Sequence, residues 1–239
     1  MLPDATQHYR GDAGRHYHAS KRALPAAAVP WVARRRAEKL QPYVNDGDVV
    51  FEYGVGLGWN LAQLRCRRKM GCDVGEFLAD SLRDTDIEFV SDPRSLPDEL
   101  ADVVVCHHTL EHLLAPAEAL TEMRRLLREA GRLVVFVPYE KERRYRRWRP
   151  DEPNHHLYSW NAQTLANLVA ECGFTVESAT IQEYGWERVA AVWACRFRLP
   201  ELGFRIIRRA GSLVFPLREV RVIATKPADP PAARPGSGV

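Results

Sequence analysis

The residues best suited to hold a ligand lie at 49–58, where Val-Val-Phe-Glu-Tyr-Gly-Val-Gly-Leu-Gly places an acid and three alternating glycines after an apolar run. An apolar run bounded by glycines predicts a buried strand that enters a tight turn. Glycine allows positive φ and lets a ligand approach the bare backbone. A helix expected at 59–67 would point its positive N-terminus at the same place. The pattern therefore predicts that an anionic or strongly polar group binds over Gly54, Gly56 and Gly58, although a turn that binds nothing fits the same letters.

Two further acids follow predicted strands. Asp73 ends the stretch Gly71-Cys72-Asp73, and Asp92 comes directly after a strand expected at Ile87–Val90. In Rossmann-like sheets an acid at the end of the second strand accepts hydrogen bonds from ribose hydroxyls. Asp73 is placed for that contact.

The glycine spacing narrows the choice of ligand. It is G-x-G-x-G, whereas the nicotinamide fingerprint is G-x-G-x-x-G, and Glu52 stands before the first glycine. This arrangement resembles motif I of the class I S-adenosylmethionine-dependent methyltransferases. The stretch from Asp102 to His112 resembles the family's D-V-V…L-E-H signature. A helix expected at Pro116–Glu129 and a strand at Arg132–Pro138, joined by Ala130-Gly131, resemble its next helix, glycine turn and fifth strand, although many members have Gly-Gly in the turn.

The resemblance covers roughly residues 46–138 well, weakens beyond them, and is closest to the broad group with the ubiquinone-biosynthesis-type and other small-molecule methyltransferases. It implies an α/β fold, namely a Rossmann-like, doubly wound, mostly parallel seven-stranded sheet with helices on both faces and an antiparallel last strand. It implies S-adenosyl-L-methionine as the cofactor, with Asp92 similar to the residue that takes the adenine amino group. The implied cofactor-binding residues are Glu52, Gly54, Val55, Gly56, Gly58, Asn60, Asp73, Val74, Asp92, Pro93, Cys106, His107 and Tyr17.

His107 and His108 follow the fourth predicted strand, beside the place where the reactive methyl lies in this fold. Methyl transfer from a sulfonium needs alignment and, for some acceptors, a base. We expect His108, or else His107, to hold or deprotonate the acceptor, the alternative being that one lines the cofactor and the other packs. His108 to His112 also matches the metallopeptidase pattern H-x-x-E-H. The small-RNA 2′-O-methyltransferases carry a metal-binding E-x-x-E-H here, but His108 replaces its first Glu, so we expect no metal.

A basic, aromatic segment at 141–149 follows the fifth predicted strand, and a second segment, basic and aliphatic, lies at 205–209. The first favours a small-molecule acceptor, of anionic character and methylated at oxygen, over a solvated loop. An RNA methyltransferase is the alternative that this segment supports, and a nicotinamide oxidoreductase is disfavoured by the glycine spacing. The non-enzyme alternative is a methyltransferase-fold protein that binds the cofactor without transferring methyl. The second segment could form a lid, touch a membrane surface or pack on the core, and packing is the favoured reading.

Length and composition fit one α/β domain with additions. The chain has 239 residues, 46% hydrophobic content and a formal charge of +3. We expect a helical arm or cap at 1–45, the cofactor-binding domain at 46–226 and a disordered tail at 227–239. Segments 139–160 and 184–213 are expected to be acceptor-side insertions. No run of eighteen apolar residues predicts a membrane span, and no signal peptide or paired cysteine pattern is seen, so a cytoplasmic protein with reduced thiols is expected. The sequence does not indicate an oligomeric state.

Overall fold

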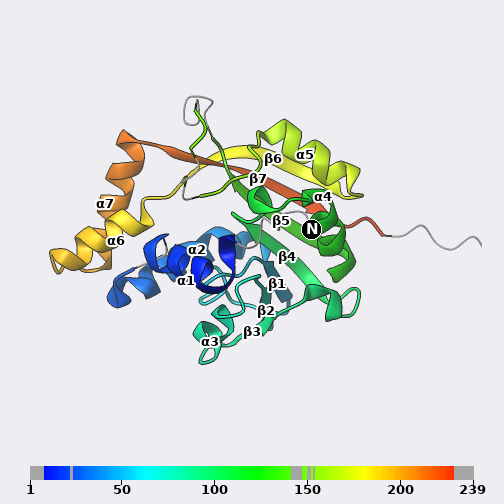
Figure 1. Cartoon of the computed structure of the whole chain (residues 1–239), viewed down its shortest axis with the longest axis horizontal. Coiled ribbons are helices and arrows are strands. Elements are labelled where there is room, and N and C mark those ends of the chain that lie inside the picture. The colour runs from blue at the N-terminus through cyan, green and yellow to red at the C-terminus, as the bar shows by residue number, and fades with distance from the viewer. Residues whose placement is uncertain (1–7, 22–23, 141–146, 150–151, 153, 229–239) are drawn as a thin grey trace, which may run out of the picture.

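The computed structural model describes residues 8–21, 24–140, 147–149, 152 and 154–228, and a seven-stranded sheet dominates it (Figure 1). The strands are β1 (Val49–Tyr53), β2 (Arg68–Cys72), β3 (Ile87–Val90), β4 (Ala101–His107), β5 (Leu127–Pro138), β6 (Thr175–Tyr184) and β7 (Leu217–Thr225). Their order across the sheet is β3-β2-β1-β4-β5-β7-β6. Strand β7 runs antiparallel to β5 and β6, and the β1 to β5 pairings are parallel. The predicted mostly parallel sheet with an antiparallel last strand is confirmed.

Helices cover both faces of this sheet, as predicted. On one face α4 (Pro116–Leu126) and α5 (Ala162–Glu171) pack in an apolar cluster that includes Leu120 and Phe51. On the other face α2 (Val29–Leu40) and α3 (Leu78–Leu82) contribute Leu40 and Leu82 to a cluster with Val50. Successive residues of one strand, Val50 and Phe51, thus enter opposite cores.

Strands β1 and β4 lie side by side, and the chain leaves them toward opposite edges of the sheet. In open α/β sheets the crevice at such a switch point, outside the carboxyl ends of the strands, is where ligands bind. The glycines after β1 and the histidines at the end of β4 meet at this crevice.

The predicted helix at 59–67 is wrong. These residues form turns, in which Leu61 N donates to Gly58 O and Leu64 N donates to Leu61 O. Arg67 N already bonds to Asp48 O beside the start of β2, so a helix through Arg67 would leave no residues to turn back toward the sheet. Without this helix, no helix N-terminus at residue 59 points its positive end at the glycines, so that part of the binding argument is also wrong. Similarly, the helix predicted to reach Glu129 ends at Leu126, because the next residue already pairs with β4.

A helical cap stands over the switch point. It consists of α1 (Gly11–Lys21), the 3-10 turn Ala26–Ala28, α2, α6 (Glu187–Arg196) and α7 (Glu201–Val214), and α6 and α7 project at one end of the molecule (Figure 1). Val32 of α2, Ala191 of α6 and Phe204 of α7 pack in one buried cluster. The N-terminal arm and the insertion at 184–213 therefore pack against each other, although the sequence indicates no contact between them.

Some sequence expectations concern residues that the structure does not describe. The predicted tail is described only at 227–228, and of the basic segment 141–149 only 147–149 are described. All five cysteines are described and none is in a disulfide. Among the described residues, no helix combines the length and apolar character needed to cross a membrane.

The capping of α5 provides a test of the local folding signals. Asn161 and Thr164 form a capping box, in which each side chain accepts a hydrogen bond from the other residue's backbone N–H. We expect Asn161→Ala to lower the free energy of unfolding by about 1 kcal/mol, because the backbone N–H of Thr164 then loses its cap. Urea unfolding followed by circular dichroism measures this. Gln163→Ala, an exposed change two residues further along the chain, is the matched control, and an equal loss in both variants would contradict the capping role.

Candidate functional site

The three glycines of the loop after β1 differ in the space that surrounds them. Gly54, Gly56 and Gly58 have φ of +85°, +52° and +72°, which side chains rarely adopt. A Cβ on Gly54 would collide with the side chain of Thr109, and one on Gly58 would collide with buried leucine and isoleucine methyls. A Cβ on Gly56 would meet nothing closer than His18 at 3.8 Å, so this backbone faces open space. Gly56 is thus the glycine that a bound group can approach.

Glu52 anchors this loop to the end of β1. It is fully buried at the end of β1 and accepts a hydrogen bond from the side-chain amide of Asn60. Arg36 of α2 donates in turn to the side-chain oxygen Oδ1 of Asn60 over 3.2 Å. These bonds fix the loop's path and tie the cap to it, whereas neither Glu52 nor Asn60 lines the cavity above.

Asp73 shapes the same loop from the end of β2. Its Oδ2 accepts the backbone N–H of Gly56 and its Oδ1 accepts that of Gly75, each over 3.0 Å. These bonds hold the carboxylate at the wall of the cavity. The orientation suits a carboxylate that also receives hydroxyl donors from a ligand.

A cavity of about 250 Å³ lies above the glycines. Of the residues expected to hold the cofactor, it is lined by Tyr17, Gly54, Gly56, Asp73, Val74 and Pro93. The others lie outside its lining, namely Glu52, Val55, Gly58, Asn60, Asp92, Cys106 and His107. Open backbone over Gly56 and a carboxylate beside it fit a nucleoside with a charged tail, so the residues present suit S-adenosylmethionine.

Asp92 and Cys106 are placed differently from what the resemblance implies. The Asp92 carboxylate accepts hydrogen bonds from the side chain and backbone of Arg94, and these bonds lower its pKa. Ser91 and Pro93 line the cavity instead. Cys106 is fully buried in β4, where burial raises the pKa of its thiol well above the usual value. An adenine contact by Asp92 stays a prediction.

Aromatic side chains from the N-terminal arm close this cavity. Tyr9 and Tyr17 both line it, with their ring centroids 5.1 Å apart. Tyr9 Oη lies 2.7 Å from Nδ1 of His112 and donates to Asn154 O. The N-terminal arm therefore packs over the cavity. Sequence reasoning selected Tyr17 but not Tyr9, His18 or His112 as site residues. The concentration of aromatic residues at 8–18 is the signal that points to Tyr9 and His18.

A second cavity, of about 330 Å³, adjoins the first at His108, which lines both. The strand ends of β4 to β7 form its floor and the cap helices α2, α6 and α7 its walls. Its lining cations are Arg35, Arg36, Lys39, Arg208 and Arg221, and its lining carboxylates are Glu183 and Glu187. Positive charge therefore predominates in this cavity.

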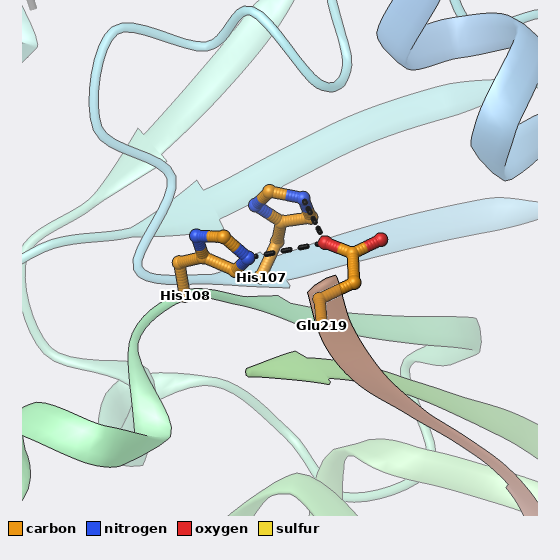
Figure 2. Close-up of side chains that lie close together, drawn as sticks. All are labelled: His107, His108 and Glu219. Carbon is orange, nitrogen blue, oxygen red and sulfur yellow. Dashed lines mark hydrogen bonds and ion pairs between the residues drawn. The ribbon is translucent and has the colours of Figure 1, made fainter. Parts of the chain in front are cut away.

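A buried carboxylate, Glu219 of β7, organises the floor between the two cavities (Figure 2). Its Oε1 lies 2.6 Å from Lys39 Nζ and accepts from Gln182 Nε2 over 2.6 Å. Its Oε2 lies 3.1 Å from His108 Nε2. Lys39 Nζ also lies 2.9 Å from His107 Nε2. Sequence reasoning missed Glu219 and Lys39, although an acid at the start of an antiparallel strand must lie at the edge where the parallel strands end.

These contacts set the charges of the cluster. Burial alone would raise the pKa of Glu219, but the hydrogen bond from His108 and the charge of Lys39 outweigh it and hold the pKa at about 2. Burial lowers the pKa of Lys39 to about 8, against the opposing attraction of Glu219. Near neutral pH the cluster therefore contains a carboxylate and an ammonium.

The same charges assign the histidine tautomers. A carboxylate only accepts, so Nε2 of His108 carries a hydrogen, and in the neutral ring Nδ1 is the nitrogen that holds the lone pair. An ammonium only donates, so Nε2 of His107 accepts from Lys39. The two rings, stacked with centroids 4.4 Å apart, thus present different atoms to their surroundings.

Two groups among the described residues could offer three metal-ligating atoms each. One is His107, His108 and Glu219, and the other is Glu111, His112 and His156, with ligand atoms within 4.8 Å of one another. In the first group Lys39 occupies the position between His107 and Glu219, which disfavours a cation. In the second, Nδ1 of His156 lies 2.8 Å from Glu140. The expectation that the chain holds no metal stays a prediction.

The acid dependence of stability tests the charge of Glu219. A carboxyl whose pKa is about 2 in the fold and 4.5 otherwise contributes stability above about pH 4.5 and loses it as the pH falls toward 2. We expect the free energy of unfolding to fall with decreasing pH between 5 and 3 more steeply in the wild type than in Glu219→Gln, by up to about 1.4 kcal/mol per pH unit for one proton. Urea unfolding at a series of pH values measures both slopes.

Glu177→Gln, an exposed carboxylate on β6, is the control for that measurement and should keep the wild-type slope. Equal slopes for Glu219→Gln and the wild type would show that Glu219 titrates normally.

Several solved structures share this fold. A candidate methyltransferase from Bacillus halodurans has a TM-score of 0.57 at 16% identity, covering 82% of this chain and 100% of that one. Phosphoethanolamine N-methyltransferase 2 of Haemonchus contortus, in complex with phosphomonomethylethanolamine and S-adenosylhomocysteine, has a TM-score of 0.59 at 12% identity, covering 90% of this chain and 60% of that one. A [4+2]-cyclase has a TM-score of 0.57 at 19% identity, covering 82% of this chain and 81% of that one. At these identities the likeness shows the fold alone, and the cyclase shows that the fold carries more than one reaction.

The family is shown by the sequence itself. No curated protein matches the chain. The family model described as "Methyltransferase domain" matches residues 26–179, which include the glycine loop, both strand-end acids and the histidine pair. The chain therefore belongs to the methyltransferase-domain family, and S-adenosylmethionine is its cofactor.

Proposed function

We propose that this methyltransferase transfers a methyl group to a hydroxyl oxygen of a small anionic acceptor, with His108 as the general base. The observation that carries the proposal is the position of His108, which borders the donor cavity and the basic cavity and is oriented by Glu219. A base at this junction lies where donor and acceptor must meet.

The chemistry requires little from the protein beyond alignment and proton removal. S-adenosylmethionine supplies an activated methyl group on a sulfonium. The chain's task is to hold the acceptor in line with that group and to take its proton as it attacks. The glycine loop, Asp73 and Tyr17 form the donor side, and the cap helices form the acceptor side.

His108 is equipped for the proton transfer. Its Nε2 donates to a carboxylate that stays ionised, so Nδ1 is the atom that accepts a proton. The ion pair with Glu219 then stabilises the resulting imidazolium, as an acid behind a histidine does in other general-base sites. His107, whose Nε2 accepts from Lys39, is assigned to holding that lysine beside Glu219. The two histidines that the sequence left as alternatives thus receive different roles.

The charge of the second cavity supports an anionic acceptor. Burial lowers the pKa of the Arg208 guanidinium, and the nearby positive charge of Arg35 lowers it further. A bound phosphate or carboxylate would relieve this repulsion and accept hydrogen bonds from the guanidinium groups. The Haemonchus contortus enzyme, which has the same fold, is in complex with a phosphate-bearing acceptor. A cavity of about 330 Å³ has the size of a small-molecule site rather than of a groove for a nucleic-acid strand.

The experiment that tests the function uses labelled methyl donor. The protein is incubated with S-adenosylmethionine that carries an isotopic methyl group and with pairs of hydroxyl compounds that differ only in a phosphate or carboxylate. We expect label in the anionic member of a pair. His108→Asn should then lower kcat by about 10²–10⁴-fold, the usual contribution of a general base, while the Kd for S-adenosylhomocysteine changes little. Asn is chosen because His108 has a φ of +53°, which Asn tolerates.

Tyr158→Phe, which removes a hydroxyl bonded to Leu114 O away from both cavities, is the control for that variant. Full activity in His108→Asn, or transfer only to neutral compounds, would contradict the proposal.

The basic cavity gives a separate prediction about acceptor binding. We expect the double variant Arg35→Ala/Arg208→Ala to raise the KM of the anionic acceptor at least tenfold, because two charge-assisted contacts are lost. Its affinity for S-adenosylhomocysteine, measured by titration calorimetry, should stay within a factor of two. Arg67→Ala/Arg83→Ala removes two exposed cations that do not line the cavity and should leave KM unchanged. An unchanged KM in the first variant would place the acceptor elsewhere.

A further inference from the structure

The exposed apolar side chains of this protein are concentrated on the outer part of the cap. Of the sixteen large hydrophobic side chains that are exposed in the described residues, eleven fall within residues 189–217. Several are more than half exposed, including Trp193, Phe197, Leu202, Ile206 and Leu213. Single exposed hydrophobic residues are common, whereas such a concentration marks an interaction surface.

Both helices of this segment have an inner and an outer apolar face. The inner side of α6, with Ala190, Ala191 and Ala194, is buried in the cluster that α2 joins. The outer side of α6 carries Val189, Val192 and Trp193 at a spacing of three and four residues, and all three are exposed.

Helix α7 repeats the arrangement. Phe204 is buried on its inner side, with its ring centroid 5.9 Å from that of Trp31. Leu202, Ile206 and Leu213 lie on its outer side, each at least 60% exposed. Packing on the core, the reading that the sequence favoured for 205–209, therefore accounts for the inner face of the helix but not for its outer face. We name the exposed residues Val189, Val192, Trp193, Leu202, Ile206 and Leu213 the outer cap face.

The charge around the outer cap face is strongly positive. Residues 187–218 contain seven arginines and two glutamates. Arg196 and Arg209 are exposed and, at 100° per residue, fall on the same sides of α6 and α7 as the apolar residues. Glu201 is already paired with Arg34 and Arg205. An occupant of this face must therefore offer both an apolar phase and negative charge.

We propose that the outer cap face docks on an anionic phospholipid bilayer, with α6 and α7 lying in the membrane interface. Amphipathic helices with aromatic and aliphatic residues on one side, flanked by arginines, bind such surfaces. A second copy of this chain would bring like charges together, so it fits the face less well. The docking is interfacial, because no described helix could cross the bilayer.

The position of α7 links the docking to the acceptor site. Arg208, on the inner side of α7, lines the basic cavity, so the docked helix is also a wall of that cavity. Docking would bring the cavity to lipid phosphates, and this consequence alone rests on the proposed function. The docking itself does not depend on any methyl transfer.

Cosedimentation of the full chain with vesicles tests the proposal, without methyl donor or acceptor. We expect binding to phosphatidylcholine vesicles that contain about one third phosphatidylglycerol, and at least tenfold weaker binding to pure phosphatidylcholine vesicles or in 0.5 M salt, because the attraction of arginines to anionic lipid is screened. Leu202→Ser/Ile206→Ser should weaken binding at least tenfold, and Arg196→Ala/Arg209→Ala should remove the preference for anionic vesicles.

The matched control is Leu114→Ser/Ile181→Ser, which removes two exposed apolar side chains elsewhere and should leave vesicle binding unchanged. Circular dichroism and the affinity for S-adenosylhomocysteine must match the wild type in every variant that is scored. Binding that does not depend on the outer cap face, or no binding to anionic vesicles, would overturn the proposal. A different result would also overturn it: the wild type does not bind vesicles, forms a dimer in sedimentation velocity, and loses that dimer in Leu202→Ser/Ile206→Ser. The outer cap face would then bind a second copy of the chain.

Discussion

The ion pair between Glu219 and Lys39 is the constraint on which the site depends. A fully buried carboxylate is costly unless it is paired and hydrogen-bonded, and Glu219 has a cation, an amide and an imidazole within reach. Lys39 comes from the cap and Gln182 from the edge strand β6, so one carboxylate joins the cap, the last two strands and the β4 loop. The orientation of His108 follows from that junction.

The residues of the cofactor site that surround the glycine loop lie close together in the sequence, so this part of the site could be predicted. The acid, the alternating glycines and Asp73 fall within residues 52–73, and the acid and glycines follow a short apolar run that predicts a strand. The acceptor half is assembled from residues far apart. Glu219 lies 111 residues after its partner His108, and nothing near either residue indicates the pairing. Hydrophobic periodicity predicts which face of a strand is buried, but not which polar atoms share that burial.

Errors in the sequence reading also have local physical causes. The residues after Gly58 have the composition of a helix, but Asn60 bonds to Glu52 and the chain must reach β2 within ten residues. Tertiary bonds thus override helix propensity. The sequence predicts the cap as two separate segments, because α2 and α7 are far apart in the chain and come together only when it folds. Their contact, with Arg35 and Arg208 on facing helices, is what concentrates positive charge over the second cavity.

The antiparallel direction of β7 has a consequence for the order in which the site comes into being. A strand that runs against its neighbours brings its beginning, rather than its end, to the edge where ligands bind, which is why a residue so late in the chain reaches the histidines. During synthesis on the ribosome, the donor cradle and both histidines emerge about a hundred residues before their carboxylate. Until β7 inserts between β5 and β6, Lys39 has no buried counter-charge to approach. The contact between His108 and Glu219 is therefore the last part of this site to form, and its formation coincides with completion of the sheet.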